Sequence, residues 1–226
     1  MAIAERYVST VVKGLVEVKD LSIVFKRRDQ YGPLLVLEST NFTICPGEFA
    51  CLLGPSGCGK STILNLIAGF LKPTKGHVFV DKQPVKGPGA ERGFVFQQYS
   101  LLPWKTTFQN VELGLKIRGV SRVERIDLVN DYLNRVGLYQ HRHSYPHQLS
   151  GGMQQRASIV RALVNSPSVL LMDEPFAALD AQTRHIMQNL LLDIWSDLKS
   201  TVIFVTHDID EAIFLSDRIF VMGVNP

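Results

Sequence analysis

Cysteine is scarce in this sequence. Only Cys45, Cys51 and Cys58 occur among 226 residues, an odd and small number that argues against a disulfide framework as the basis of the fold. Such sparing use of cysteine fits a reducing compartment.

Long apolar runs are also missing. A membrane-spanning helix needs roughly 18 to 20 consecutive apolar residues, whereas the longer runs here, at residues 49–53, 169–172 and 202–205, have the length of strands. The amino terminus carries Glu5, Arg6 and Lys13 among its apolar residues and so lacks the uninterrupted segment of a secretory signal. We therefore expect a cytosolic chain that does not itself cross a bilayer.

Strong charge of one sign is absent. The net charge is +3 and 20% of residues are charged, which gives no support for nucleic-acid binding, where a concentrated basic face is expected. The densest basic run, Lys26-Arg27-Arg28, is interpreted as a solvated turn, and contact with a lipid headgroup is the alternative.

The apolar residues that are present predict an α/β fold. They make up 46% of the chain, enough for a sizeable core. Short β-type runs at residues 14–20, 21–25, 34–39 and 48–53 predict an amino-terminal antiparallel sheet that leads into a central buried strand. From residue 166 onward strands and helices alternate, which predicts a parallel sheet flanked by helices. We expect a single domain over residues 1–226.

Residues 98–165 are predicted to be mostly helical and to form a helical subdomain. Within them, Ser121 and Glu124 have the spacing of a capping box, and Gly137 can end the same helix in a left-handed conformation. The residues expected on the buried face of that helix are Val123, Ile126, Val129, Leu133 and Val136.

A glycine-rich segment lies between a predicted strand and a predicted helix. It fits the pattern G-x-x-x-x-G-K-[ST], in which backbone N–H groups and the positive end of the helix surround phosphate oxygens. Lys60 is expected to reach the β- and γ-phosphates, Ser61 to bind Mg²⁺, and Thr62 to support the α-phosphate. The residues of this predicted ATP site are Gly54, Pro55, Ser56, Gly57, Cys58, Gly59, Lys60, Ser61 and Thr62. For Cys58, a passive small residue is favoured over a redox-reactive thiol.

Polar residues at the ends of three other predicted strands complete a catalytic site. Asp173 and Glu174 are adjacent on a strand, so their side chains point apart and are expected to do different work. We expect Asp173 to hold Mg²⁺ and Glu174 to orient or deprotonate the attacking water. His207 is expected to contact the γ-phosphate, and the amide oxygen of Gln97 suits Mg²⁺ or the water.

The segment "LSGGMQQR", residues 149–156, resembles the signature of the ABC ATPase family. The resemblance covers nearly the whole chain, and it implies a P-loop NTPase core of the ABC type with an antiparallel β subdomain. It also implies adenine stacking by Phe25, a Q-loop at Gln97, a D-loop with Asp180 at the dimer contact, and a switch histidine at His207. Longer matches, including "YPHQLSGGMQQR" and "DEPFAALDAQTR", are similar to ATPases of nitrate, sulfonate and taurine importers.

Such a resemblance implies an ATP-hydrolysing subunit that energises import of a small anionic solute of the nitrate, sulfonate, taurine or bicarbonate type. Its partners would be a second ATPase subunit, head to tail, membrane-spanning permease subunits and, indirectly, a solute-binding protein, at the cytoplasmic side of the membrane. Ser150, Gly151 and Gly152 would open a helix whose positive end meets the γ-phosphate held by the partner copy. Family members usually extend beyond the last strand, so a shortened carboxyl terminus is expected at Pro226.

A cluster of mainly apolar residues follows Gln97. It is predicted to receive a cytoplasmic helix of the permease, with ordinary core packing as the alternative. The cluster consists of Tyr99, Leu101, Leu102 and Trp104.

Four other functions are weighed against import of a small anionic solute. An importer ATPase for another solute or an exporter ATPase would use the same motor chemistry. A nucleic-acid-processing ABC ATPase would carry long insertions or paired cassettes, and the sequence has neither. An inactive regulatory subunit is disfavoured because Lys60, Glu174 and His207 are all in place.

Overall fold

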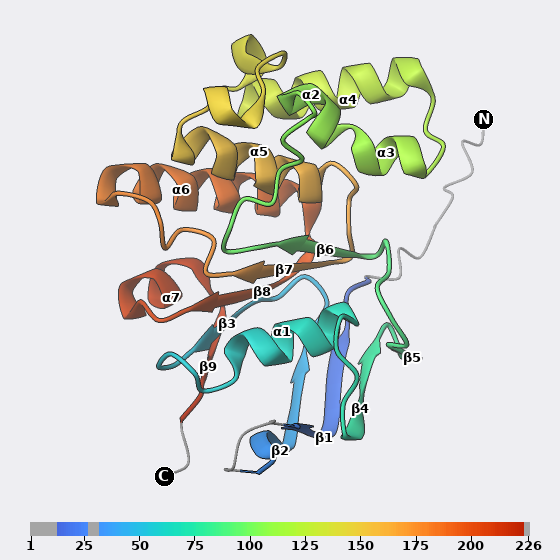
Figure 1. Ribbon diagram of the computed structural model, residues 1–226, viewed down its shortest axis with the longest axis vertical. Helices are drawn as coiled ribbons and strands as arrows, with labels where there is room; N and C mark the ends of the chain where they lie inside the picture. Colours follow the sequence, from blue (N-terminus) through green and yellow to red (C-terminus); the bar gives the residue numbers. More distant parts are fainter. Residues whose placement is uncertain (1–12, 27–31, 224–226) are drawn as a thin grey trace, which may run out of the picture.

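Two sheets and a set of helices make up the protein (Figure 1). The computed structural model describes residues 13–26 and 32–223. The turn expected at residues 27–29, most of the basic run Lys26-Arg27-Arg28, and Pro226 lie outside the described residues. The strands are β1 (Val16–Phe25), β2 (Leu34–Ile44), β3 (Phe49–Leu53), β4 (Lys75–Val80), β5 (Gln83–Pro84), β6 (Arg92–Val95), β7 (Val169–Asp173), β8 (Thr201–Thr206) and β9 (Arg218–Val221).

The first sheet is antiparallel, in the order β2-β1-β4-β5. The two runs predicted at residues 14–25 form one strand, β1, which pairs with β2 from Val16 opposite Ile44 to Phe25 opposite Leu34. Register shifts within β1 accommodate Asp20, whose φ of 49° lies in the left-handed region. The pattern predicted this sheet but not its strands β4 and β5, which follow the first long helix.

The second sheet is parallel, in the order β6-β7-β8-β3-β9. Its side chains alternate between two cores, as the two faces of a strand require. Cys51, Met172 and Phe204 belong to the core under the carboxyl-terminal helices, whereas Leu52 and Leu171 belong to the core shared with the antiparallel sheet. The predicted α/β arrangement is therefore confirmed.

Helices cover both faces of the parallel sheet. They are α1 (Lys60–Ala68), α2 (Thr107–Val111), α3 (Leu113–Ile117), α4 (Arg122–Arg135), α5 (Gly151–Leu163), α6 (Ala181–Leu198) and α7 (Ile209–Leu215), with short 3₁₀ turns at Tyr139–His141 and Pro146–Gln148. In Figure 1, α1 lies between the two sheets, and α5 and α6 lie on the opposite face of the parallel sheet beneath α2 to α4. The described chain has helices and no strand between residues 98 and 165.

Helix α4 begins and ends where the sequence predicts. The Ser121 hydroxyl accepts the Glu124 N–H at 3.3 Å, although no return bond from the Glu124 side chain forms, so the capping box is half made. After the helix, Gly137 has a φ of 66°, and Leu138 N–H donates to the Leu133 carbonyl at 2.7 Å. Gly137 therefore ends the helix as expected.

The predicted buried face of α4 is only partly correct. Val129, Leu133 and Val136 are buried, but Val123 is 72% exposed and Ile126 is 36% exposed. Helical spacing puts all five on one stripe, whereas burial depends on how far the neighbouring helices reach. Ile126 instead lines an open groove between α2, α3 and the first turns of α4.

No helix in the described ranges combines the length and the apolar character that a bilayer crossing requires.

Candidate active site

The polar residues predicted to form the site lie at the carboxyl ends of four strands, along one edge of the parallel sheet. Gln97 follows β6, Glu174 follows β7, His207 follows β8, and the glycine-rich loop follows β3. Because all four strands run in the same direction, their carboxyl ends meet at the crevice where open α/β sheets bind ligands.

The loop from Gly54 to Gly59 joins β3 to the amino terminus of α1. Gly59 has a φ of 100°, which strains other residues, and a side chain at Gly54 would lie 2.5 Å from the Met222 carbonyl oxygen. Gly59 is also the N-cap of α1, where no side chain accepts a bond from the first turn. The free N–H groups and the helix dipole therefore favour an anion here.

Lys60 is folded back onto this loop. Its ammonium donates to the Gly54 carbonyl at 2.7 Å and the Pro55 carbonyl at 2.9 Å, and the residue is 5% exposed. A buried ammonium is stable only with such acceptors, and phosphate oxygens can take their place. Its Nζ also lies 4.0 Å from the buried Cys58 sulfur.

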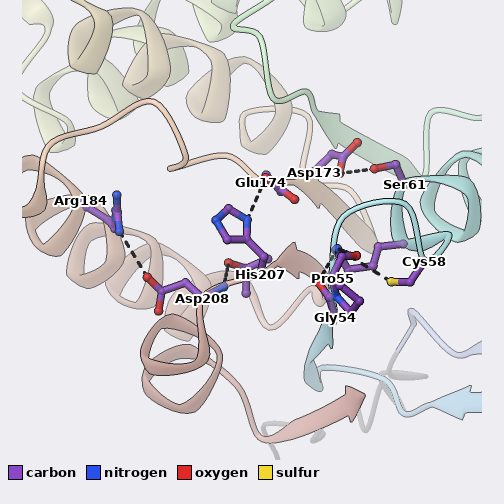
Figure 2. Close-up of polar contacts among 11 residues, drawn as sticks. Gly54, Pro55, Cys58, Ser61, Asp173, Glu174, Arg184, His207 and Asp208 are labelled. Carbon is purple, nitrogen blue, oxygen red and sulfur yellow. Dashed lines mark hydrogen bonds and ion pairs between the residues drawn. The ribbon is translucent and has the colours of Figure 1, made fainter. Parts of the chain in front are cut away.

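Ser61 and Asp173 meet across the crevice. The Ser61 hydroxyl donates to Asp173 Oδ1 at 2.9 Å (Figure 2). Burial raises the pKa of Asp173, while the Ser61 bond and the Lys60 charge act in the opposite direction. A hydroxyl beside a partly buried carboxylate is an oxygen donor set that suits Mg²⁺ and would be better satisfied by a cation.

Glu174 turns away from Asp173, as the sequence predicts for neighbours on a strand. Its Oε2 lies 3.2 Å from His207 Nδ1, and the side chains are 19% and 57% exposed, respectively (Figure 2). The backbone at Glu174 has a φ of 41°, a conformation unusual outside glycine, and its N–H donates to the Val205 carbonyl at 3.0 Å. Strain of this kind often marks functional sites.

A cavity of about 410 Å³ opens over the glycine-rich loop. Phe25, Gln97 and Glu174 line it together with loop residues and the start of α1, so the structure brings these predicted residues together. The aromatic ring, the glycine-rich backbone and the carboxylate thus border one space.

The signature segment does not join this cavity. Ser150 is the N-cap of α5 and accepts the Met153 N–H at 3.3 Å, with Gly151 and Gly152 in the first turn. None of the described residues that line the cavity comes from this segment, and α5 lies across the parallel sheet from α1 (Figure 1). A side chain at Gly151 would lie 2.8 Å from the Tyr99 hydroxyl.

Asp180 is exposed at the start of α6. Its Oδ1 accepts the Thr183 N–H at 3.0 Å, and bonding to Thr183 lowers the pKa of this carboxyl. The residue is therefore an ionised helix cap on the surface of the chain.

The cluster after Gln97 is split between core and surface. Trp104 is 70% exposed, whereas Leu101 packs against the core and the Leu102 backbone bonds to the Asn110 side chain. Tyr99 is half-buried beside the signature helix. Core packing, the alternative interpretation, thus accounts for part of the cluster but not for Trp104.

Three phenylalanines form an aromatic group that the sequence analysis missed. Phe70 lies 5.3 Å from Phe94 and 6.1 Å from Phe96, between ring centroids, and Phe94 lies 4.4 Å from Phe96. Phe70 and Phe96 remain 47% and 38% exposed. The only sequence signal was a strand-like "GFVF", which predicts burial, while Phe70 follows the end of α1 far away in the chain.

Comparison with known proteins identifies the family. A model of the ABC transporter family matches residues 37–177, more than half of the chain. The nitrate import ATP-binding protein NrtD of Synechocystis sp. is 50% identical over 210 residues, which cover 93% of this chain and 78% of that protein. The taurine import ATP-binding protein TauB of Yersinia pestis is 50% identical over 190 residues, which cover 84% and 74%.

A solved structure agrees with these relatives. The ATP-binding cassette MJ0796, in a dimeric post-hydrolysis state bound to ADP and Pi, is 36% identical, with a TM-score of 0.82 over 92% of this chain and 94% of that one. The predicted resemblance to ATPases of nitrate and taurine importers is confirmed. The chain belongs to the ABC transporter family and is an ATPase of the ABC class.

Proposed function

We propose that this ATPase drives import of a small anionic solute of the nitrate, sulfonate, taurine or bicarbonate type through a membrane permease. The observation that carries the motor chemistry is the meeting of Lys60, the Ser61–Asp173 pair and the Glu174–His207 pair at one sheet edge. The two importer relatives at 50% identity support the direction and the solute class.

When ATP binds, the ammonium of Lys60 exchanges one set of hydrogen-bond acceptors for another. Lys60 gives up the Gly54 and Pro55 carbonyls for the β- and γ-phosphates of ATP, and backbone N–H groups of the loop and the first turn of α1 bind the remaining oxygens. Phe25, on the rim of the same cavity, stacks on the adenine.

Ser61 and Asp173 would hold Mg²⁺, and the amide oxygen of Gln97 would be a further ligand from the same cavity. When bound, the ion neutralises charge on the phosphate oxygens. A cation beside Asp173 would also offset the cost of burying its carboxylate, which the hydrogen bond from Ser61 only partly relieves.

Glu174 orients the attacking water and accepts its proton. His207 contacts the Glu174 carboxylate through Nδ1, which leaves Nε2 free to face the γ-phosphate. Because its two ring nitrogens contact different groups, His207 aligns the general base Glu174 with the γ-phosphate.

A second copy supplies the signature helix. Ser150 to Gly152 lie outside the cavity of their own chain, so the free helix tip is available to the γ-phosphate of a partner arranged head to tail. Asp180 lies at the contact between the copies. ATP then favours the closed pair, and hydrolysis removes that preference.

The aromatic residues Trp104, Phe70 and Phe96 are proposed to receive a cytoplasmic helix of the permease. Docking holds the ATPase peripherally at the cytoplasmic face of the membrane, and the permease in turn receives the solute from a binding protein. On this proposal residues 1–226 form one ATPase domain, with a helical subdomain at about 98–165.

Solute uptake tests the proposal. Cells lacking the transporter are supplied with the permease and either the wild-type chain or a Lys60→Ala variant, and uptake of labelled nitrate, taurine and bicarbonate is measured. Uptake of one of these anions that depends on Lys60 supports import. Efflux instead of uptake, or uptake only of solutes that lack an anionic group, would contradict it.

A further inference from the structure

Arg184 joins two turns that carry the proposed catalytic groups. It lies in the first part of α6, and its guanidinium donates through Nη2 to the Leu179 carbonyl at 3.1 Å and through Nη1 to Asp208 Oδ2 at 3.3 Å. Figure 2 shows the side chain directed toward Asp208, the residue that follows His207. One planar group thus contacts a turn on each side of the site.

The first of these turns begins at Glu174. Ala177 N–H donates to the Glu174 carbonyl at 3.2 Å, and Leu179 N–H donates to the Phe176 carbonyl at 3.1 Å. The Leu179 carbonyl that Arg184 binds is therefore the far end of a hydrogen-bonded segment that starts at the proposed base. The backbone hydrogen bonds within this segment therefore couple the position of the Leu179 carbonyl to that of Glu174.

The second turn is fixed by Asp208. Its Oδ1 caps α7 by accepting the Glu211 N–H at 3.0 Å, and its own N–H donates to the Thr206 hydroxyl at 3.0 Å. The other carboxylate oxygen, Oδ2, is left for Arg184. Asp208 therefore links Arg184 rigidly to the backbone that presents His207.

Little else holds the His207 ring. The side chain is 57% exposed, and its 3.2 Å contact with Glu174 is the one hydrogen bond its ring makes among the described residues. Arg184, Asp208, Glu174 and His207 all line one small cavity of about 50 Å³. The Arg184 clamp thus lies directly behind the Glu174–His207 pair rather than on a remote surface.

We infer that Arg184 is a positioning residue, which keeps Glu174 and His207 aligned by tying the Leu179 turn to Asp208. An ordinary half-exposed ion pair would contribute little to either stability or turnover. The guanidinium of Arg184, by contrast, donates to an acceptor on each of two turns and so fixes the distance between Glu174 and His207. Proton transfer is sensitive to that distance. This inference rests on the catalytic roles proposed for Glu174 and His207.

Steady-state ATP hydrolysis by the full chain tests the clamp in Arg184→Gln, Asp208→Asn and the double variant. The Asn side chain keeps an oxygen that can cap α7 but loses the charge that holds Arg184. We expect kcat to fall about tenfold in each single variant while KM for ATP changes by less than about twofold. The double variant should be no slower than the slower single variant, because one interaction is removed in all three.

Arg135→Gln is the matched control. Arg135 forms a similar arginine–carboxylate pair with Asp197, between α4 and α6, away from the sheet edge. This variant should keep the wild-type kcat, and thermal unfolding of every variant separates loss of turnover from loss of fold. If Arg184→Gln does not fold, the kcat of Asp208→Asn compared with that of Arg135→Gln tests the inference by itself.

Two results would overturn the inference: a kcat in Arg184→Gln or Asp208→Asn equal to that of Arg135→Gln, or single effects that multiply in the double variant. Failure of the underlying catalytic proposal has a different signature. If Glu174 is not the base, the Glu174→Gln variant itself would retain turnover of ATP.

Discussion

Replacing Glu174 by Gln is the sharpest perturbation of the proposed chemistry. The amide has nearly the same shape as the carboxylate, so the 3.2 Å contact with His207 Nδ1 and the left-handed backbone at this position are retained. What disappears is the ability to take a proton from water. Because the side chain is 19% exposed and can still accept a hydrogen bond, we expect the fold to keep its stability within about 1 kcal/mol.

The expected loss follows from the role of a general base. Such a group contributes about 10²- to 10⁴-fold, or roughly 3 to 6 kcal/mol of activation free energy at about 1.4 kcal/mol per tenfold. ATP affinity should be unchanged, since Lys60, the loop N–H groups and the Ser61–Asp173 pair are untouched. The variant should therefore bind ATP normally and hydrolyse it at about 1% of the wild-type rate or less.

Phosphate release in a single turnover is the appropriate assay, because it reports the chemical step without product release. Glu91→Gln serves as a control, since Glu91 is a carboxylate paired with Arg92 near the amino end of β6, far from the crevice in the sheet. The control should hydrolyse ATP at the wild-type rate. If Glu174→Gln does so too, Glu174 is not the base.

Three further outcomes are expected. Trp104→Ala and Phe70→Ala should weaken co-purification with the permease while leaving ATP binding by the isolated chain intact; full assembly of both variants would exclude this docking surface. Burial raises the pKa of Cys51 to about 12, so iodoacetamide at pH 8 should modify exposed Cys45 in the native chain and Cys51 only after unfolding, as peptide mass spectrometry can show. Burial also raises the pKa of Glu211, so the folded state holds this proton more tightly than the unfolded state, and the resulting stability is lost as pH rises through the folded pKa. Denaturant titrations above the usual carboxyl pKa of 4.5 should thus show a steeper loss of unfolding free energy in the wild type than in Glu211→Gln; equal slopes would contradict this.

Local patterns predicted the elements that carry the site. Strand-length apolar runs followed by Gly54, Asp173 or His207 place those residues at strand ends, and the parallel order then brings the ends together without further information. The cap at Ser121 and the stop at Gly137 were likewise encoded within a few residues. The resemblance to ABC ATPases added Phe25, whose position on the cavity rim no periodicity reveals.

What escaped prediction depends on contacts between distant segments. Val123 and Leu133 lie on the same face of α4, but Val123 is exposed because no neighbouring helix in the described part of the chain covers that end of the face. Helical spacing alone therefore overestimated its burial. Phe70 and Phe96 are separated in sequence and meet only because the segments that follow α1 and β6 come together in the fold. The Arg184–Asp208 contact joins the starts of two helices in the same way, and no local spacing in the sequence predicts that these two side chains meet.

In the proposed dimer each ATP site is shared, with Lys60 from one copy and Ser150 from the other. Complementation measures this directly: Lys60→Ala and Ser150→Arg chains are assayed for ATP hydrolysis separately and mixed. Each homodimer would lack an intact site, whereas a mixed pair rebuilds one from Lys60 of the second chain and Ser150 of the first. We expect two inactive variants whose mixture regains turnover; a mixture as inactive as its components, or a Ser150→Arg chain that hydrolyses ATP like the wild type, would show that the site is not shared.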